Sequence, residues 1–154
     1  KGRDIKIVVD ATKELLVKSL PYGPFLIKPN NYELGEIFGV RLTTRSSVIP
    51  YAKKLQNMGA RNVLVSMAGE GAVLVSDDGQ VIDAPAPEGK LINGVGAGDS
   101  MVAGFMAGYL ARHDYNHAFC MGVASGSASA FSENLATKEE IEKVYKTIVL
   151  EEKV

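Results

Sequence analysis

The sequence predicts an α/β domain, or part of one, with a mostly parallel sheet and an antiparallel meander at one edge. Over residues 5–58, short β-branched strands alternate with amphipathic helices at the short spacings typical of parallel βαβ units. Residues 62–85 then give three short strands separated by glycine-containing turns, which is the pattern of a meander. The remainder reads as three helices, and no repeat or linker interrupts the chain.

The first half supplies its elements in a regular order. We expect a strand over 5–9, a helix over 13–20, a strand over 24–30, and helices over 30–39 and 44–58. Ile5, Ile7, Val8 and Val9 predict a buried strand that ends at Asp10.

The helix over 44–58 is expected to bury one side and to end at Gly59. The apolar residues of that side are Val48, Tyr51, Leu55 and Met58.

The second half begins with strands over 62–66, 71–76 and 80–85, the last two joined by a hairpin turn at Asp78-Gly79. A helix follows whose apolar residues recur at helical spacing: Val102, Phe105, Met106, Tyr109 and Leu110. Within it, Gly104 and Gly108 would permit close approach of a neighbouring element. A small-residue helix over about 115–131 follows, and Thr137 with Glu140 forms the capping box of the last helix.

Composition excludes several classes of function. The chain has 154 residues, 46% of them hydrophobic, a net charge of −1 and a pI near 6.2, so it lacks the basic footprint of a nucleic-acid or anionic-membrane binder. Its most apolar run is far shorter than the roughly 20 residues of a membrane span. The single cysteine, Cys120, cannot form an intramolecular disulfide, which favours a reducing, cytoplasmic location.

The stretch NGVGAGDS, residues 93–100, is the strongest chemical signal. Glycines before a helix let a ligand approach first-turn amides that have no partners within the helix, which makes an anion site suited to phosphate. An acid there would repel that anion, unless it accepts a proton from a hydroxyl that attacks the phosphate. Asp99 is therefore a candidate general base, and its alternative role is to cap the helix.

Three ordered motifs resemble those of the ribokinase-like, or PfkB, carbohydrate kinases. GAGDS opens a helix, Asn30 to Glu33 matches the family's N-x-x-E after Lys28-Pro29, and Ser66 to Gly71 is similar to its nucleotide loop. The tail over 122–134 is similar to the family's helix near the adenine. The resemblance covers essentially the whole chain and is closest to the phosphosugar branch.

The resemblance implies a role for each of these residues. Asp99 would be the catalytic base, and the amides around Gly96, Ala97 and Gly98 would hold the transferring phosphoryl group. ATP would be bound by eight residues: Lys28, Asn30, Ser66, Gly69, Glu70, Gly71, Val123 and Ser127. Asn30 and Glu33 would hold Mg²⁺ through water.

Each of these roles has a structural alternative. Asn30 with Glu33 is also a capping-box pattern, and the glycines of 66–71 would serve a plain turn. Lys28 would be a surface lysine, and small residues such as Ser127 suit a packed helix without any ligand.

Two further sites, one for a monovalent cation and one for a His-ligated metal, lack residues that they would need. Many family members have Asp or Ser where this chain has Asn93, in a region that joins a monovalent-cation site, so a cation requirement is doubtful. His113 and His117 lie four residues apart, but without a third ligand they are expected to flank a break between helices. Cys120 is expected to be a small buried residue.

The resemblance implies an ATP-dependent kinase for a sugar phosphate, either fructose 1-phosphate or tagatose 6-phosphate. Alternatives are a kinase for an unphosphorylated sugar or nucleoside, a non-catalytic nucleotide-binding module, and a structural domain. Residues 1–154 would be the C-terminal, ATP-binding part of one incomplete ribokinase-like domain, inactive alone and a homodimer in the full-length protein. Its partners would be ATP and a small phosphosugar.

Overall fold

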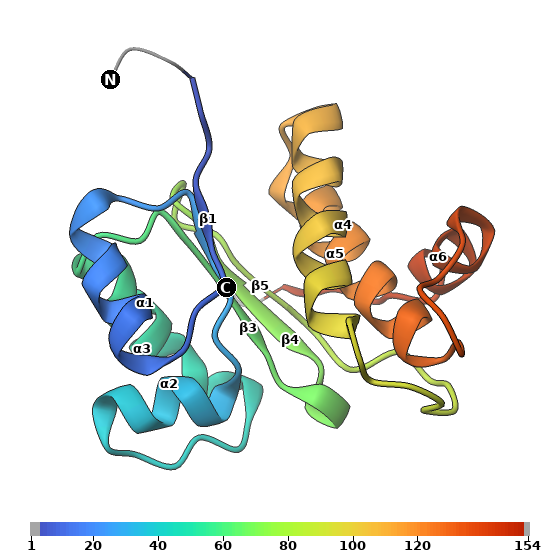
Figure 1. Cartoon of the computed structure of the whole chain (residues 1–154), viewed down its shortest axis with the longest axis horizontal. Coiled ribbons are helices and arrows are strands. Elements are labelled where there is room, and N and C mark those ends of the chain that lie inside the picture. Colours follow the sequence, from blue (N-terminus) through green and yellow to red (C-terminus); the bar gives the residue numbers. More distant parts are fainter. Residues whose placement is uncertain (1–3, 153–154) are drawn as a thin grey trace. The chain divides into compact units, whose positions relative to one another are not determined.

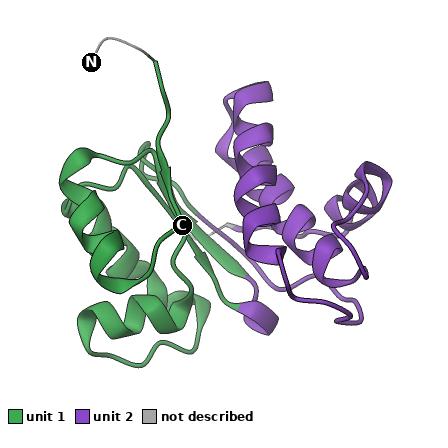
Figure 2. Ribbon diagram, in the orientation of Figure 1, with its two compact units in different colours: residues 1–67, 72–81 green, residues 68–71, 82–154 purple. Residues whose placement is uncertain are grey.

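The computed structural model describes residues 4–152, which form two compact units (Figures 1 and 2). Unit 1 comprises Lys1–Met67 and Ala72–Val81, and unit 2 comprises Ala68–Gly71 and Ile82–Val154. Each unit is described by itself below.

The strands of unit 1 pair side by side in chain order. β1 (Val8–Val9), β2 (Leu26–Ile27) and β3 (Asn62–Ser66) are parallel, and β4 (Ala72–Val75) runs antiparallel to β3. The predicted change from parallel to antiparallel pairing is therefore confirmed. The prediction that residues 5–9 form a buried strand is wrong in part, because Ile5 and Ile7 are 66% and 55% exposed and only two residues pair.

The helices of unit 1 begin and end at the predicted signals. α1 (Lys13–Ser19) runs into the 3₁₀ turn η1 (Leu20–Tyr22), α2 (Asn31–Phe38) ends at Gly39, and α3 (Arg45–Asn57) begins after Thr44. Gly39 has φ +68°, which a residue with a side chain rarely adopts, and the Thr44 side chain accepts the Ser47 amide.

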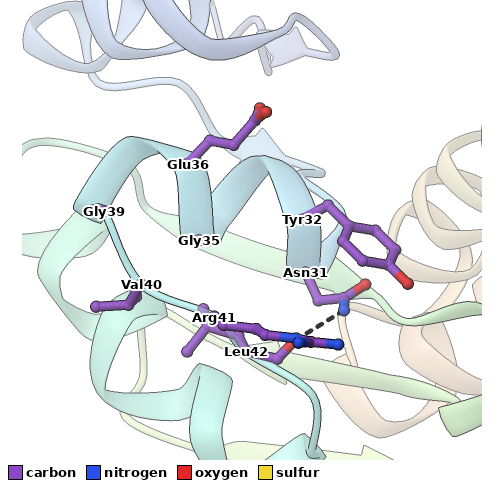
Figure 3. A pocket seen from close by; sticks show the side chains of 8 residues that line it. All are labelled: Asn31, Tyr32, Gly35, Glu36, Gly39, Val40, Arg41 and Leu42. Atoms are coloured by element: carbon purple, nitrogen blue, oxygen red, sulfur yellow. Dashed lines mark hydrogen bonds between the residues drawn. The ribbon is translucent and has the colours of Figure 1, made fainter.

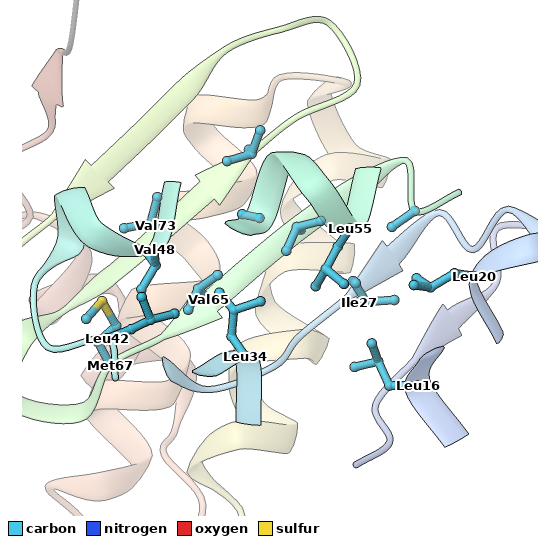
Figure 4. Close-up of a cluster of buried hydrophobic side chains, with 14 residues drawn as sticks. Leu16, Leu20, Ile27, Leu34, Leu42, Val48, Leu55, Val65, Met67 and Val73 are labelled. Carbon is cyan, nitrogen blue, oxygen red and sulfur yellow. The ribbon is translucent and has the colours of Figure 1, made fainter. Parts of the chain in front are cut away.

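The core of unit 1 lies between its strands and these helices (Figure 4). Leu16, Leu34, Val48 and Leu55 pack with strand residues such as Val65 and are at most 1% exposed. The expected apolar side of α3 is confirmed for Val48 and Leu55, and Tyr51 packs against the core partly buried. Met58 is 41% exposed, because it lies at the C-cap beyond the last helical turn.

Unit 2 is mostly helical. It contains η2 (Ala68–Glu70), most of β5 (Val81–Ala84), α4 (Ala97–Arg112), α5 (Tyr115–Ala130), α6 (Lys138–Tyr145) and β6 (Glu151–Glu152), which pairs antiparallel with β5. The capping box of α6 is confirmed, since the Thr137 side chain accepts the Glu140 amide and the Glu140 carboxylate accepts the Thr137 amide. β6 was not predicted, because two glutamates carry no strand signal.

Glycines hold α4 and α5 together. A Cβ at Gly104 would lie 2.2 Å from the Ser125 hydroxyl and 2.5 Å from the Met121 carbonyl oxygen, and one at Gly126 would lie 3.0 Å from the Ala97 carbonyl oxygen. The expected close approach at Gly104 and Gly108 is thus confirmed. The expected apolar face of α4 is wrong in part: Phe105 is fully buried, but Leu110 is 57% exposed, because the contact surface is centred on the two glycines.

None of the helices within residues 4–152 is long and apolar enough to cross a membrane.

Replacing Gly104 by Ala is expected to destabilise the protein by about 1–3 kcal/mol, the usual cost of overpacking. The added methyl group meets a backbone carbonyl that cannot move unless the two helices separate. Urea unfolding followed by far-UV circular dichroism measures the change. Gly69→Ala is the matched control, because no atom lies within 4 Å of its added Cβ. Equal stability of the two variants would contradict the glycine-dependent packing.

Acidification is expected to destabilise unit 2 through His117. Burial, together with the positive charge of Arg112, lowers the pKa of His117 against the opposing charge of Asp114. The unfolded chain therefore binds more protons below about pH 6.5, so stability falls from pH 7.5 to 5.5. His117→Phe should reduce this fall in thermal unfolding experiments.

Tyr145→Phe is the control variant. The Tyr145 hydroxyl lies 2.8 Å from His117 Nδ1, but it is not among the causes of the lowered pKa of His117. It should retain the wild-type pH dependence. An unchanged pH dependence in His117→Phe would show that another group is responsible.

Candidate functional site

In unit 1, polar residues gather where the parallel strands end. Asp10 follows β1, Lys28 follows β2, and Ser66 ends β3. Sheets of this kind bind ligands outside the carboxyl ends of their strands. This edge is therefore the candidate site of unit 1.

Lys28 is held in place by an acid. Its side chain is nearly buried, and Nζ lies 3.7 Å from Asp10 Oδ1. The alternative of a surface lysine is therefore wrong. Sequence reasoning missed Asp10 as a site residue, and the available signal was an acid directly after an apolar strand.

Asn30 and Glu33 form a complete capping box at the start of α2. Asn30 Oδ1 accepts the Glu33 amide at 2.8 Å, and Glu33 Oε2 accepts the Asn30 amide at 2.9 Å. The helix-capping role, which is the structural alternative for this pair, is therefore confirmed. Glu33 Oε1 makes no hydrogen bond within the described residues, which leaves one carboxylate oxygen for a further partner.

The remaining oxygen suits magnesium that keeps its own waters, as this ion usually does. The described residues contain no cluster of three or more His, Cys, Asp or Glu side chains able to hold a metal ion by themselves. The pair therefore fits a water-mediated contact and does not form a closed protein cage.

Ser66 is brought beside Asn30. The two residues form an isolated parallel bridge, and the Ser66 amide donates to the Pro29 carbonyl oxygen at 3.1 Å. The sequence did not predict this contact, because the two residues are far apart in the chain and meet only through the parallel pairing of β2 and β3.

In unit 2, the glycine loop ends at the first turn of α4. Gly96 is the N-cap, with φ +78°, and Asp99 is the third helical residue. The Ala97 amide donates to the Gly94 carbonyl oxygen at 3.3 Å, whereas the amides of Gly98 and Asp99 donate to no acceptor within residues 4–152. The loop thus presents unpaired donors at the positive end of a helix of 16 residues.

The Asp99 carboxylate is exposed and has no hydrogen-bond or ion-pair partner among the described residues. The N-cap is Gly96, so the alternative in which Asp99 serves only to cap the helix is wrong. An unpaired acid beside unpaired amides is free to meet a ligand.

The predicted nucleotide loop contains η2. Gly71 has φ +101°, and a Cβ there would lie 2.0 Å from the Ala84 carbonyl oxygen, so packing alone requires glycine. Gly69 and Glu70 are exposed, and a Cβ at Gly69 would meet nothing. Ala68 has φ +46°, a conformation that favours glycine, so it carries local strain.

Val123 and Ser127 lie one turn apart on α5. Val123 is 2% exposed and Ser127 is half-buried, so Ser127 offers more surface to a ligand. Cys120 is buried as predicted, and burial with the Asp114 charge raises the pKa of its thiol to about 11. A break between two helices is present as predicted, but it covers only residues 113 and 114: His113 is the C-cap of α4, and His117 is the third residue of α5.

A pocket of about 410 Å³ adjoins α2 and the segment after it (Figure 3). It is lined by Asn31, Tyr32, Gly35, Glu36, Gly39, Val40, Arg41 and Leu42. The Asn31 side chain donates to the Leu42 carbonyl oxygen at 2.9 Å and so fixes one wall. The pocket contains none of the predicted site residues.

Comparison with curated proteins gives close relatives. The chain is 48% identical over 144 residues to a 1-phosphofructokinase of Bacillus subtilis, covering 94% of this chain and 47% of that protein. The chain thus spans about half the length of the curated relatives it matches.

Solved structures agree on the fold. Phosphofructokinase-2 from Escherichia coli, in complex with substrates and products, superposes with a TM-score of 0.83 at 33% identity, over 92% of this chain and 47% of that one. Ribokinase from Arabidopsis thaliana, complexed with ribose and ATP, has a TM-score of 0.75 at 19% identity over 92% and 48% of the two chains. The predicted ribokinase-like fold is therefore confirmed.

The sequence profile of the pfkB family of carbohydrate kinases matches residues 2–142. That match includes the GAGDS loop, the N-x-x-E motif and the loop after β3. The chain belongs to the pfkB family of carbohydrate kinases.

Proposed function

We propose that the protein transfers the γ-phosphoryl group of ATP to a hydroxyl of a phosphorylated sugar, with fructose 1-phosphate as the acceptor. One observation carries the proposal: the exposed, unpartnered carboxylate of Asp99 stands beside the unpaired amides of Gly98 and Asp99. Membership of a carbohydrate kinase family supports the same chemistry.

In this reaction Asp99 accepts the proton of the attacking sugar hydroxyl. The sugar oxygen forms a bond to the γ-phosphorus, the bond from that phosphorus to the bridging oxygen breaks, and ADP leaves with the electron pair. The first-turn amides of α4 stabilise the negative charge on the phosphoryl oxygens during transfer. They do so without reorganising, because Gly96 already fixes the loop in its left-handed turn.

The remaining residues bind the nucleotide. Lys28 supplies a positive charge toward the phosphates, with Asp10 limiting its movement. Asn30 and Glu33 would hold Mg²⁺ through water, and the bound ion would neutralise charge on the phosphates. Ser66 and the segment 69–71 line the nucleotide, and Ser127 contacts the adenine.

The relatives support fructose 1-phosphate as the acceptor. The 48% identical protein carries the name 1-phosphofructokinase, which favours fructose 1-phosphate over tagatose 6-phosphate or an unphosphorylated sugar. The homodimer stays a prediction, and the departure at Asn93 gives no support to a monovalent-cation requirement.

A coupled ADP-release assay with ATP and Mg²⁺ tests the proposal on two preparations. One is the 154-residue chain, and the other is the complete product of the gene that encodes it. Fructose 1-phosphate is compared with tagatose 6-phosphate, fructose 6-phosphate and ribose, and the highest kcat/KM is expected for fructose 1-phosphate. ATP binding without turnover of any acceptor by either preparation would instead favour a non-catalytic nucleotide-binding module.

Asp99→Asn is expected to lower kcat by at least about 10²–10³, because the amide cannot accept the hydroxyl proton. The Kd for ATP should change by less than about threefold, since the backbone amides remain. Steady-state kinetics and calorimetric titration measure the two quantities. Asp114→Asn is the matched control: Asp114 caps α5, and Asn is an equally good N-cap. Near-normal turnover by Asp99→Asn would remove this acid from the mechanism.

Glu33→Gln is expected to weaken the magnesium dependence without unfolding α2. A capping box accepts Gln as well as Glu, so the hydrogen bond from the Asn30 amide is retained while the charge is lost. The Mg²⁺ concentration for half-maximal activity should rise several-fold at an unchanged melting temperature. Glu140→Gln makes the same change in the capping box of α6 and should leave that concentration unaltered. Identical magnesium curves for the two variants would contradict the assignment.

A further inference from the structure

The glycine loop of unit 2 is fastened to the end of α5. The amides of Ile92 and Asn93 both donate to the Ala130 carbonyl oxygen, at 2.8 and 3.1 Å. These contacts fix where the loop begins, but they leave residues 94–96 without support from the backbone of α5.

Asn93 supplies that support with both ends of its side chain. Its Nδ2 donates to the Glu133 carbonyl oxygen at 3.1 Å, and its Oδ1 accepts the Val95 amide at 3.0 Å. One amide side chain therefore ties the loop to the segment after α5 and also shapes the turn that leads into Gly96.

A second contact fixes the helix start. The buried Ser129 hydroxyl donates to the Ser100 hydroxyl at 3.0 Å and accepts the Ala136 amide at 3.2 Å. Ser100 directly follows Asp99. The connection over 131–136 is thus tied to the chain on both sides of the Gly98 and Asp99 amides. Asn93 makes the tie before them, and Ser100 makes the tie after them through Ser129.

We propose that Asn93 is a positioning residue for phosphoryl transfer, which holds the glycine loop so that the first-turn amides and Asp99 meet the phosphoryl group in a fixed geometry. The inference rests on the proposed kinase function and adds a residue to it. Asn93 acts through the loop backbone and is assigned no contact with substrate. Because preorganised donors act mainly in the transition state, its loss should lower kcat more than it raises KM.

Asn93→Asp separates the two hydrogen bonds. The variant has nearly the same shape and keeps an oxygen for the Val95 amide, but a carboxylate then faces the Glu133 carbonyl oxygen without a proton between them. At pH 7.5 kcat should fall about tenfold, which corresponds to the loss of roughly one hydrogen bond, while KM for ATP stays within about twofold.

The pH profile gives a readout that a general loss of stability would not produce. A protonated carboxyl group can donate to the Glu133 carbonyl as the amide does, so kcat of the variant relative to wild type should rise as pH falls from 8 to 4, close to the ordinary pKa of about 3.9 for an aspartic acid. Taking the ratio to wild type cancels any pH dependence that the two enzymes share. A ratio that is constant with pH, or a change in KM alone, would overturn the proposal.

Hydrogen exchange measures how firmly the glycine loop is held, and this measurement does not require kinase activity. In the 154-residue chain, Asn93→Asp should speed exchange of the hydrogen-bonded amides of Val95, Ala97 and Ser100 at an unchanged melting temperature, and Ser129→Ala should act in the same direction. Asn116→Asp makes the same change in charge at the opposite end of α5 and should leave both exchange and kcat unaltered.

The two failures can be told apart. If neither the 154-residue chain nor the complete gene product phosphorylates any of the tested sugars, the proposed function fails, while faster exchange in Asn93→Asp still establishes the hold on the loop. If wild type is active and Asn93→Asp matches it in kcat and exchange, the positioning role alone is wrong.

Discussion

The close contact of α4 with α5 is the constraint on which unit 2 depends. Gly104 and Gly126 bring each helix against the backbone or hydroxyl groups of the other, at separations that leave no room for a methyl group at Gly104 and little room at Gly126. The first turn of α4 is therefore held beside the last turns of α5, where Ser129 reaches Ser100. The packing of this helix pair therefore fixes the position of the glycine loop. The residues that pack the two helices thus also set the geometry of the proposed site.

In unit 1, strand pairing rather than helix packing brings the candidate site residues together. Parallel pairing of β1, β2 and β3 brings together the residues that follow each strand, and side-chain contacts then fix them individually. Asp10 holds Lys28, while Asn30 and Glu33 complete a helix cap that still leaves one carboxylate oxygen unused. A structural role and a proposed binding role therefore coexist in the same pair, because each carboxylate has two oxygens.

Local signals predicted most of the elements. Asn30 with Glu33 and Thr137 with Glu140 marked helix starts, because a capping box needs only residues three apart. Gly39 marked a helix end, because its left-handed conformation is local to one residue. The predictions failed where burial decides the outcome: Ile5, Met58 and Leu110 are apolar but exposed.

The sequence by itself determined the order of the strands and helices up to α6, the family motifs and the identity of the candidate base, since each is encoded in a few neighbouring residues. Only the tertiary structure decided that Asp10 restrains Lys28, that Ser66 lies beside Asn30, and that Asn93 reaches Glu133 across 40 positions. These contacts join residues distant in the chain, so they exist only once strands pair and helices pack, and no local pattern specifies them.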